Sequence, residues 1–150
     1  MREILKTGST IYKLAALSNF LVTIPAFVAY DRTVALFGTA RPDYPFLVWI
    51  WAGMAFLWGV MFWDISRDLV RGSPMIKYSY LEKGVTSTSV LIAYLSGNVP
   101  TAFLVAIAFT DMVWIPLFIW VHVTIARTSA IGARETAAIA EATEPRSRRD

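Results

Sequence analysis

Four long apolar blocks, separated by short polar segments, constrain the fold of this chain more than any other feature. They cover about residues 9–30, 46–63, 75–96 and 101–126. Each is close to the roughly 20 residues that a helix needs to cross the hydrocarbon core of a bilayer. Hydrophobic residues make up 56% of the chain and charged residues 17%, which is more apolar than an average soluble domain. The sequence therefore predicts an all-α integral membrane protein, a four-helix bundle over residues 1–127.

The connections between the blocks are short, and they set how neighbouring spans run. Residues 31–45 join the first span to the second, residues 64–74 the second to the third, and residues 97–100 the third to the fourth. The last of these, Gly-Asn-Val-Pro, has the composition of a tight turn. We therefore expect the third and fourth spans to be antiparallel neighbours. Pro25 and Pro116 lie inside the first and fourth spans, where proline kinks a helix.

Basic residues indicate how the spans are oriented. The loop between the third and fourth spans has none, and the loop between the first and second has only Arg32 and Arg41. The other edge holds Arg2, Lys6, Lys13, Arg67, Arg71, Lys77, Arg127 and Arg134, followed by three arginines near the C-terminus. The positive-inside rule then predicts that both termini are cytoplasmic, in a bacterial inner membrane. Residues 128–150 would be a cytoplasmic tail, helical to about Thr143 and then disordered.

The composition excludes several classes of site. The chain has no cysteine, so it cannot form disulfides or thiolate metal sites. Its one histidine, His122, cannot supply both axial ligands of a haem. We expect His122 to be an interfacial residue or a proton-linked group. We predict no metal site and identify no cofactor, although a quinone fits such a chain. No basic patch with interleaved aromatics points to nucleic acid, and membrane lipid is the expected surrounding.

Two charged residues lie inside predicted spans. Asp111 is about 16 Å below the outer turn and Lys83 about 21 Å below it, at 1.5 Å per residue. A lone charge at this depth costs about 2.5 to 3.5 kcal/mol on insertion scales, and pairing lowers that cost. The two residues are on adjacent spans, so an ion pair between them is sterically feasible. Whether their helical faces agree stays open, because an error of one residue rotates a face by about 100°.

Other polar residues lie at a similar depth. Asn19 on the first span and the run of Thr and Ser at residues 86–89 on the third reach the same layer. We therefore take Asn19, Lys83, Thr86 and Asp111 as candidate ligand-binding residues, with Asp111 and Lys83 as candidate catalytic residues. Two alternatives stay open. Polar residues in membrane bundles often serve only to join helices, and this layer could also face a partner subunit.

A second cluster of charges lies at the predicted cytoplasmic edge. It comprises Asp64, Arg67, Asp68 and Arg71, with Glu82 as a candidate partner of Arg67 or Arg71. The aspartate–arginine pairs are three residues apart, so each pair shares a helical face. One interpretation is a solvated helix end with extended arginine side chains. The other is a cytoplasmic gate held by Glu82.

The pattern as a whole resembles small bacterial membrane proteins of the DoxX-like type. The resemblance covers roughly residues 10–126 and departs from redox-active bundles that use a Cys-x-x-Cys pair. The features that carry it are Asn19, Pro25, "LFGTARPDYP", Gly59, "DISRDLVRG", Lys83, Gly97, Pro100, Asp111, Trp114 and Phe118. It implies a four-helix bundle in the inner membrane, with Asn19, Lys83 and Asp111 as the functional positions. Some relatives of this type look like subunits of quinone-reducing oxidoreductases.

Three functions are consistent with the sequence. The first is a non-enzymatic accessory or subunit protein that holds a membrane-protein partner or a hydrophobic small molecule within the bilayer. The second is an oxidoreductase subunit or enzyme acting on a quinone or isoprenoid-like substrate, with Asp111 and Lys83 as an acid–base pair. The third is a small transporter, which with only four spans would need to form a homodimer.

Overall fold

A computed structural model describes residues 2–36 and 43–143, and every element in these ranges is a helix. The tail predicted to be disordered, residues 144–150, and Arg41 lie outside the described residues. The elements in chain order are α1 (Arg2–Val28), α2 (Tyr30–Leu36), α3 (Pro45–Arg67), α4 (Leu69–Leu95), α5 (Thr101–Ile107), the π-helical turn η1 (Ala108–Met112) and α6 (Trp114–Thr143). The predicted all-α class is confirmed for this part of the chain.

Three segments of the described chain are long and apolar enough to cross a membrane. They are Glu3–Val28, Pro45–Arg67 and Thr101–Gly132. The predicted third span falls on α4, which has 27 residues but is not among these three. The reason is its composition, since α4 carries Glu82, Lys83 and the run of Thr and Ser at residues 86–89.

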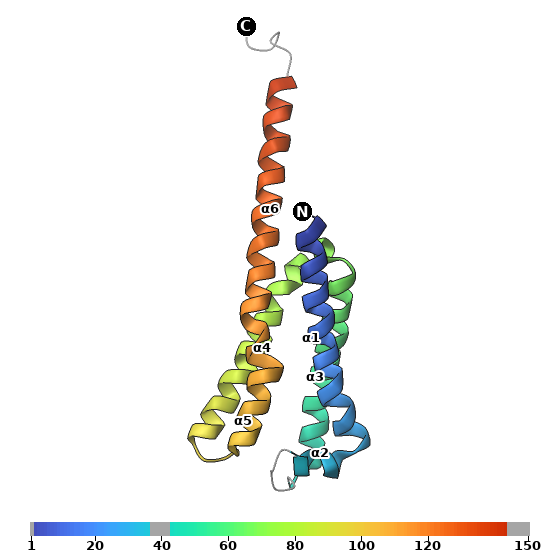
Figure 1. Ribbon diagram of the computed structural model, residues 1–150, viewed down its shortest axis with the longest axis vertical. Coiled ribbons are helices and arrows are strands. Elements are labelled where there is room, and N and C mark those ends of the chain that lie inside the picture. Colours follow the sequence, from blue (N-terminus) through green and yellow to red (C-terminus); the bar gives the residue numbers. More distant parts are fainter. Residues whose placement is uncertain (1, 37–42, 144–150) are drawn as a thin grey trace.

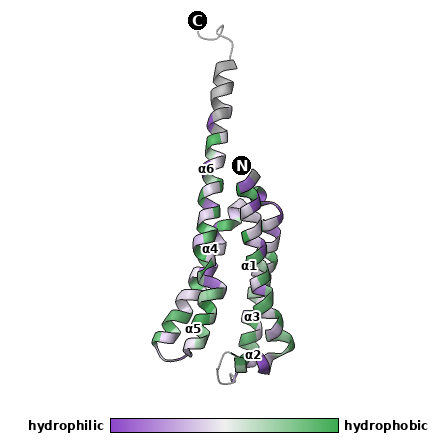
Figure 2. Ribbon diagram, viewed as in Figure 1, coloured by the Kyte–Doolittle hydropathy of each residue, from purple (hydrophilic) through white to green (hydrophobic). Residues whose placement is uncertain are grey.

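The helices form two pairs (Figure 1). α1 packs mainly on α3, and α4 packs mainly on α6 and η1. The N-terminus and the C-terminal part of α6 lie toward one end of the molecule, while α2 and the turn between α4 and α5 lie toward the other. Hydrophobic residues run along the lengths of the helices, and hydrophilic ones gather near the N-terminus and at α2 (Figure 2).

Residues 64–74 connect α3 to α4, as predicted, and helix occupies all of this connection except one residue. α3 ends at Arg67 and α4 begins at Leu69, so Asp68 alone separates them. Asp68 is extended, and its carboxylate accepts hydrogen bonds from the backbone N–H groups of Val70 and Arg71 at 3.1 and 3.0 Å. This is the N-cap arrangement that satisfies the free donors at a helix start.

The predicted tight turn at residues 97–100 is confirmed. Gly97 has a φ of +73°, which a glycine adopts without strain. The backbone N–H of Asn98 donates to the carbonyl of Ala93 at 2.9 Å, and that of Gly97 donates to Tyr94 at 2.9 Å. These bonds close the end of α4 in the manner of a Schellman motif. The chain then reverses, and α5 packs antiparallel against α4.

The apolar core lies in the half of the bundle that holds the N-terminus. We call this the terminal half and define it by its core residues, Tyr12, Ala15, Ala16, Phe62, Ile65, Leu69, Ile76, Phe118, Val121 and Ile125. Three of their rings form a closed aromatic layer. Tyr12 stacks on Phe118 at 4.6 Å between ring centroids, and Phe62 lies 5.1 Å from Phe118. Each of these three side chains is fully buried.

Large apolar side chains cover the outside of the helices. Leu21, Val28, Leu57 and Phe109 each expose about two thirds of their surface or more. Apolar exposure on this scale marks a surface that contacts lipid or another protein. This exposure agrees with a membrane protein, in which the outer apolar side chains contact lipid instead of packing inside the chain.

Candidate functional site

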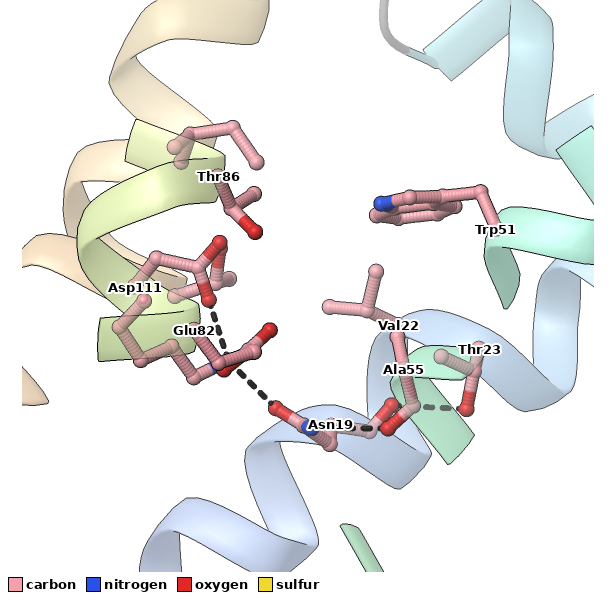
Figure 3. Close-up of a pocket in the computed structure, with 11 residues that line it drawn as sticks. Asn19, Val22, Thr23, Trp51, Ala55, Glu82, Thr86 and Asp111 are labelled. Atoms are coloured by element: carbon pink, nitrogen blue, oxygen red, sulfur yellow. Dashed lines mark hydrogen bonds and ion pairs between the residues drawn. The ribbon is translucent and has the colours of Figure 1, made fainter. Parts of the chain in front are cut away.

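Polar side chains from three parts of the chain converge at mid-length between the two helix pairs (Figure 3). Asn19 comes from α1, Glu82 and Lys83 from α4, and Asp111 from η1. Lys83 is 2% exposed, Asn19 5% and Asp111 6%. We call these four residues the polar cluster. It brings together the residues that the sequence placed at one depth, with Glu82 in addition.

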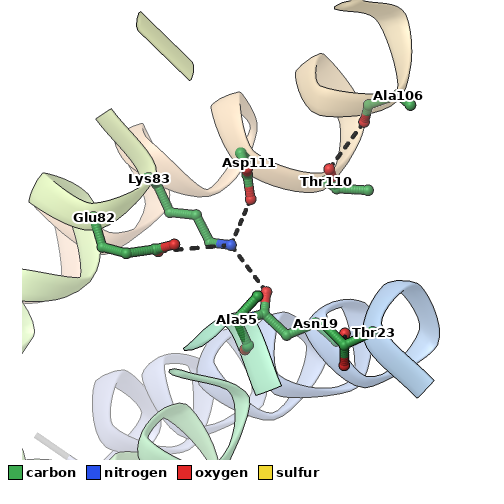
Figure 4. Close-up of polar contacts among 8 residues, drawn as sticks. All are labelled: Asn19, Thr23, Ala55, Glu82, Lys83, Ala106, Thr110 and Asp111. Carbon is green, nitrogen blue, oxygen red and sulfur yellow. Dashed lines mark hydrogen bonds and ion pairs between the residues drawn. The ribbon is translucent and has the colours of Figure 1, made fainter. Parts of the chain in front are cut away.

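Lys83 is the centre of the polar cluster (Figure 4). Its Nζ donates a hydrogen bond to Oδ1 of Asp111 at 2.5 Å and another to Oδ1 of Asn19 at 2.9 Å. The sequence left open whether Lys83 and Asp111 face each other, and in the structure they do. The ion pair offsets the cost of removing both charges from water, and removing one partner would leave the other uncompensated.

Asn19 ties the polar cluster to α3. Its Nδ2 donates to the backbone carbonyl of Ala55 at 2.8 Å while its Oδ1 accepts from Lys83. Thr23, one turn further along α1, donates to the carbonyl of Asn19 at 2.8 Å. A Cβ at Gly59 would lie 3.2 Å from Cβ of Asn19 and 2.7 Å from the Phe20 ring, so glycine permits this close approach of α1 and α3.

Asp111 is placed by an irregular turn rather than by a regular helix. In η1, the N–H of Val113 donates to the carbonyl of Ala108 at 3.3 Å, five residues back. Pro116 follows Met112 by four residues and has no N–H to donate to its carbonyl, and its ring crowds that position. The predicted irregularity from Pro116 therefore takes the form of a π turn one helical turn earlier. Asp111 lies within this turn and points at Lys83.

Glu82 belongs to the polar cluster and not to the charges at the α3–α4 junction. One of its carboxylate oxygens, Oε2, lies 3.7 Å from Nζ of Lys83. That oxygen is shielded from solvent and makes no hydrogen bond within the chain. The predicted gate, in which Glu82 pairs with Arg67 or Arg71, is therefore wrong. Neighbouring residues on a helix face directions about 100° apart, and here Lys83 and Glu82 both reach inward.

The remaining charged residues of the second predicted cluster stay together at the α3–α4 junction. Asp64, Arg67, Asp68 and Arg71 are all exposed and line one surface hollow with Met61 and Met75. Asp68 has the separate role of capping α4. The arrangement agrees with a solvated helix end.

A small cavity lies above the polar cluster, on the side away from the aromatic layer. Its volume is about 30 Å³, and its lining includes Val22, Thr23, Trp51, Thr86 and Thr110 along with the cluster residues (Figure 3). This is enough for one or two water molecules. Thr86 thus has the cavity-lining position that the sequence predicted.

An apolar groove of about 380 Å³ adjoins this cavity on the surface between α3 and α4. The two share Trp51, Ala55, Glu82 and Thr86, so the groove lies beside the cavity and the polar cluster. The rest of the groove is formed by Met54, Trp58, Tyr78, Leu81 and Val85. Its volume is within the range that holds small organic ligands, whereas the cavity alone is not.

Further polar groups lie between the polar cluster and the terminal end. The Tyr80 hydroxyl is 3.2 Å from Nδ1 of His122, which joins α4 to α6. The hydroxyls of Tyr12 and Ser79 are fully buried and make no hydrogen bond in the described structure. Sequence reasoning missed Tyr12, Ser79 and Trp51. The spacing of Tyr12, Asn19 and Thr23, at seven and four residues, was the signal that they share one face of α1.

The described residues contain no group of three His, Asp or Glu side chains that could hold a metal ion. Comparison of the chain with known protein families, with curated proteins and with solved structures finds no match. The site must therefore be interpreted from its own geometry, and the DoxX-like resemblance stays a prediction.

Proposed function

We propose that this protein is a four-span bundle of the bacterial inner membrane that holds a lipid-soluble small molecule at its polar cluster. The observation that carries the proposal is the shared lining of the α3–α4 groove and the cavity above Lys83 and Asp111. An apolar surface that leads to a few convergent polar groups is the usual form of a small-molecule site. A quinone or isoprenoid-like molecule has the required combination of apolar body and polar head.

The four-span architecture with cytoplasmic termini is part of this proposal. α4 packs on α3 and α6, two of the apolar helices, and its inward face carries the charge that lowers its hydropathy. Lys6, Arg67 and Arg71 belong to the end that holds the N-terminus and the α3–α4 junction. Basic residues at that end favour its cytoplasmic location.

Native mass spectrometry of gently extracted protein tests the ligand. We expect a bound apolar molecule in the wild-type protein and its loss in Thr86→Leu, because the larger side chain fills the cavity. Thr88→Leu is the matched control, since Thr88 is exposed on the same helix and does not line the cavity. A stoichiometric second protein in place of a small molecule would instead favour an accessory-subunit role, and a bare monomer would contradict both.

An acid–base role in a membrane oxidoreductase or enzyme is the second candidate. It is favoured by the contact of Lys83 with Asp111 directly beneath the cavity. A carboxylate and an ammonium in one water-poor site can transfer protons to and from a bound substrate. Asp111→Asn should then abolish turnover while the protein stays folded and inserted. Loss of folding in that variant would favour a structural role.

A further inference from the structure

Glu82 lies where the cavity and the groove meet, and it lines both. Its Oε2 atom is shielded and has no hydrogen-bond partner within the chain. The nearest ammonium, Nζ of Lys83, is 3.7 Å away, which is beyond hydrogen-bonding distance. A shielded carboxylate oxygen without a donor is costly, so a donor supplied at this position is strongly favoured.

Lys83 does not provide that donor in the geometry observed, because its Nζ is 3.7 Å from the oxygen. An ammonium has three N–H donors, and two of them serve Asp111 and Asn19. The polar cluster also has unequal formal charges, with one ammonium against the two carboxylates of Glu82 and Asp111. The sum is −1 when both carboxyl groups are ionised, in a site largely removed from water. A negatively charged head group would add repulsion there, whereas a positive or hydrogen-donating head group would reduce the imbalance.

The groove gives the other half of the recognition. It is bordered by the indole rings of Trp51 and Trp58 and by Leu81 and Val85, and it faces outward between α3 and α4. Such a surface accommodates an alkyl or isoprenoid chain, and away from the cavity its lining adds the phenol of Tyr78. Glu82 is the charged side chain of this lining, so a molecule whose head donates to a carboxylate would be oriented with that head at Glu82.

We infer that the ligand is an amphipathic molecule whose head donates hydrogen bonds, a hydroxyl or a protonated amine, to Glu82. Molecules with a carboxylate or phosphate head are disfavoured, because the ionised carboxylates of Glu82 and Asp111 outnumber the one ammonium of the polar cluster. This inference rests on the proposed ligand site and names the chemistry of its occupant. Among lipid-soluble redox molecules it selects the hydroxyl-bearing reduced form over the carbonyl-bearing oxidised form.

Three probes that differ only in their head group test this selectivity. They are 11-bromoundecylamine, 11-bromoundecanol and 11-bromoundecanoate, added to the full chain in lipid nanodiscs. Bromine quenches tryptophan fluorescence at short range, and the groove contains Trp51 and Trp58. We expect the amine and the alcohol to half-saturate the quenching at concentrations about tenfold or more below the carboxylate. A hydrogen bond to a charged group is worth about this difference.

Substitutions test whether the difference between the probes comes from Glu82 and whether the probes lie in the groove. Glu82→Gln should abolish most of the difference between the amine and the carboxylate. Asp64→Asn is the matched control, because it also removes one carboxylate but at an exposed position far along α3. It should leave the difference unchanged. Replacing Trp51 and Trp58 together with phenylalanine should remove the saturable quenching, which places the probe in the groove.

The outcomes separate this inference from the proposed function. If no probe quenches saturably, the ligand site itself is contradicted. If all three half-saturate at the same concentration, the site exists but does not select donors, and the inference fails alone. If the carboxylate binds most tightly, Lys83 recognises the head group and the inference is overturned. The comparison of probes in the wild-type protein decides among these without depending on how any variant folds.

Discussion

The two halves of the bundle are built differently, although the same helices run through both. In the terminal half, Tyr12, Phe62 and Phe118 reach across the centre and close it with stacked rings. In the other half, which we call the open half, most buried positions carry small side chains, namely Thr23, Ala26, Ala52 and Ser87, and Ile107 is the large exception. The polar cluster lies at the boundary between them. One half fixes the relative positions of the helices, and the other leaves space above the charges.

Side-chain size explains the difference. Small residues let α1 and α3 approach closely, as they commonly do in membrane helix pairs. They do not reach from that pair across to α4 and α5. The cavity residues Val22, Trp51 and Thr86 are accordingly on the open-half side of Lys83. The comparison predicts that the polar cluster is approached from the open half and sealed from the terminal half.

Thiol accessibility is the sharpest test of that asymmetry, with an all-or-none outcome expected. The chain has no cysteine, so single cysteines can be introduced without a background. Thr86→Cys should react with a membrane-impermeant thiol reagent applied from the side of the α4–α5 turn. Ser79→Cys, one helical turn away on the other side of the polar cluster and fully buried, should react from neither side. Equal reaction of both would show that the aromatic layer does not seal the bundle.

The largest loss of stability should come from a substitution in the polar cluster, at the boundary between the two halves. Lys83→Met leaves the carboxylates of Asp111 and Glu82 without their ammonium, and we expect it to cost about 3 to 5 kcal/mol of unfolding free energy. Adding Asp111→Asn and Glu82→Gln removes the unpaired charges and should recover most of the loss. Unfolding in detergent micelles measures both. A stable single variant would mean that the pair contributes little to folding.

A somewhat smaller loss of unfolding free energy is expected when a core side chain of the terminal half is truncated. Phe118→Ala removes a fully buried ring that contacts both Tyr12 and Phe62, at a cost of about 3 kcal/mol. Phe109→Ala is the control, because Phe109 is 76% exposed on the same stretch of chain. It should change the unfolding free energy by less than about 0.5 kcal/mol. Similar losses from both would contradict the division into a packed and an exposed set.

The smallest expected changes in stability come from alanine substitutions at two glycines, and they have opposite signs. Gly59→Ala should cost about 1 to 3 kcal/mol, since its Cβ would meet the Phe20 ring at 2.7 Å. Gly84→Ala should stabilise α4 by about 0.5 to 1 kcal/mol, because no atom lies within 4 Å of the added Cβ. The two melting temperatures, measured side by side, check the prediction. Destabilisation at Gly84 would indicate that this face of α4 is covered in the membrane.

Some of this arrangement could be predicted from the sequence, and the reasons are specific. The depth of Lys83 and Asp111 follows from counting residues from a short turn, and so does their adjacency. The place of Glu82 could not be obtained this way, because rotation about a helix is not fixed by depth. The one-residue break at Asp68 could not be predicted either, because the polar composition of residues 64–74 is also typical of a longer loop. The unequal halves depend on side chains from different helices meeting, which no local pattern records.

The π turn has a consequence for how the carboxylate of Asp111 is aimed. A π turn holds one residue more than the α-helical turn that it replaces, and each residue turns an α-helix by about 100°. It therefore sets the rotation of α5 independently of the rotation of α6. Asp111 and Phe118 are seven residues apart, so they share the inward face of the helix that follows the π turn. In a chain without Pro116, relaxation of η1 to regular helix would rotate α5 by about 100° relative to that face, so the proline sets how α5 is turned toward α4.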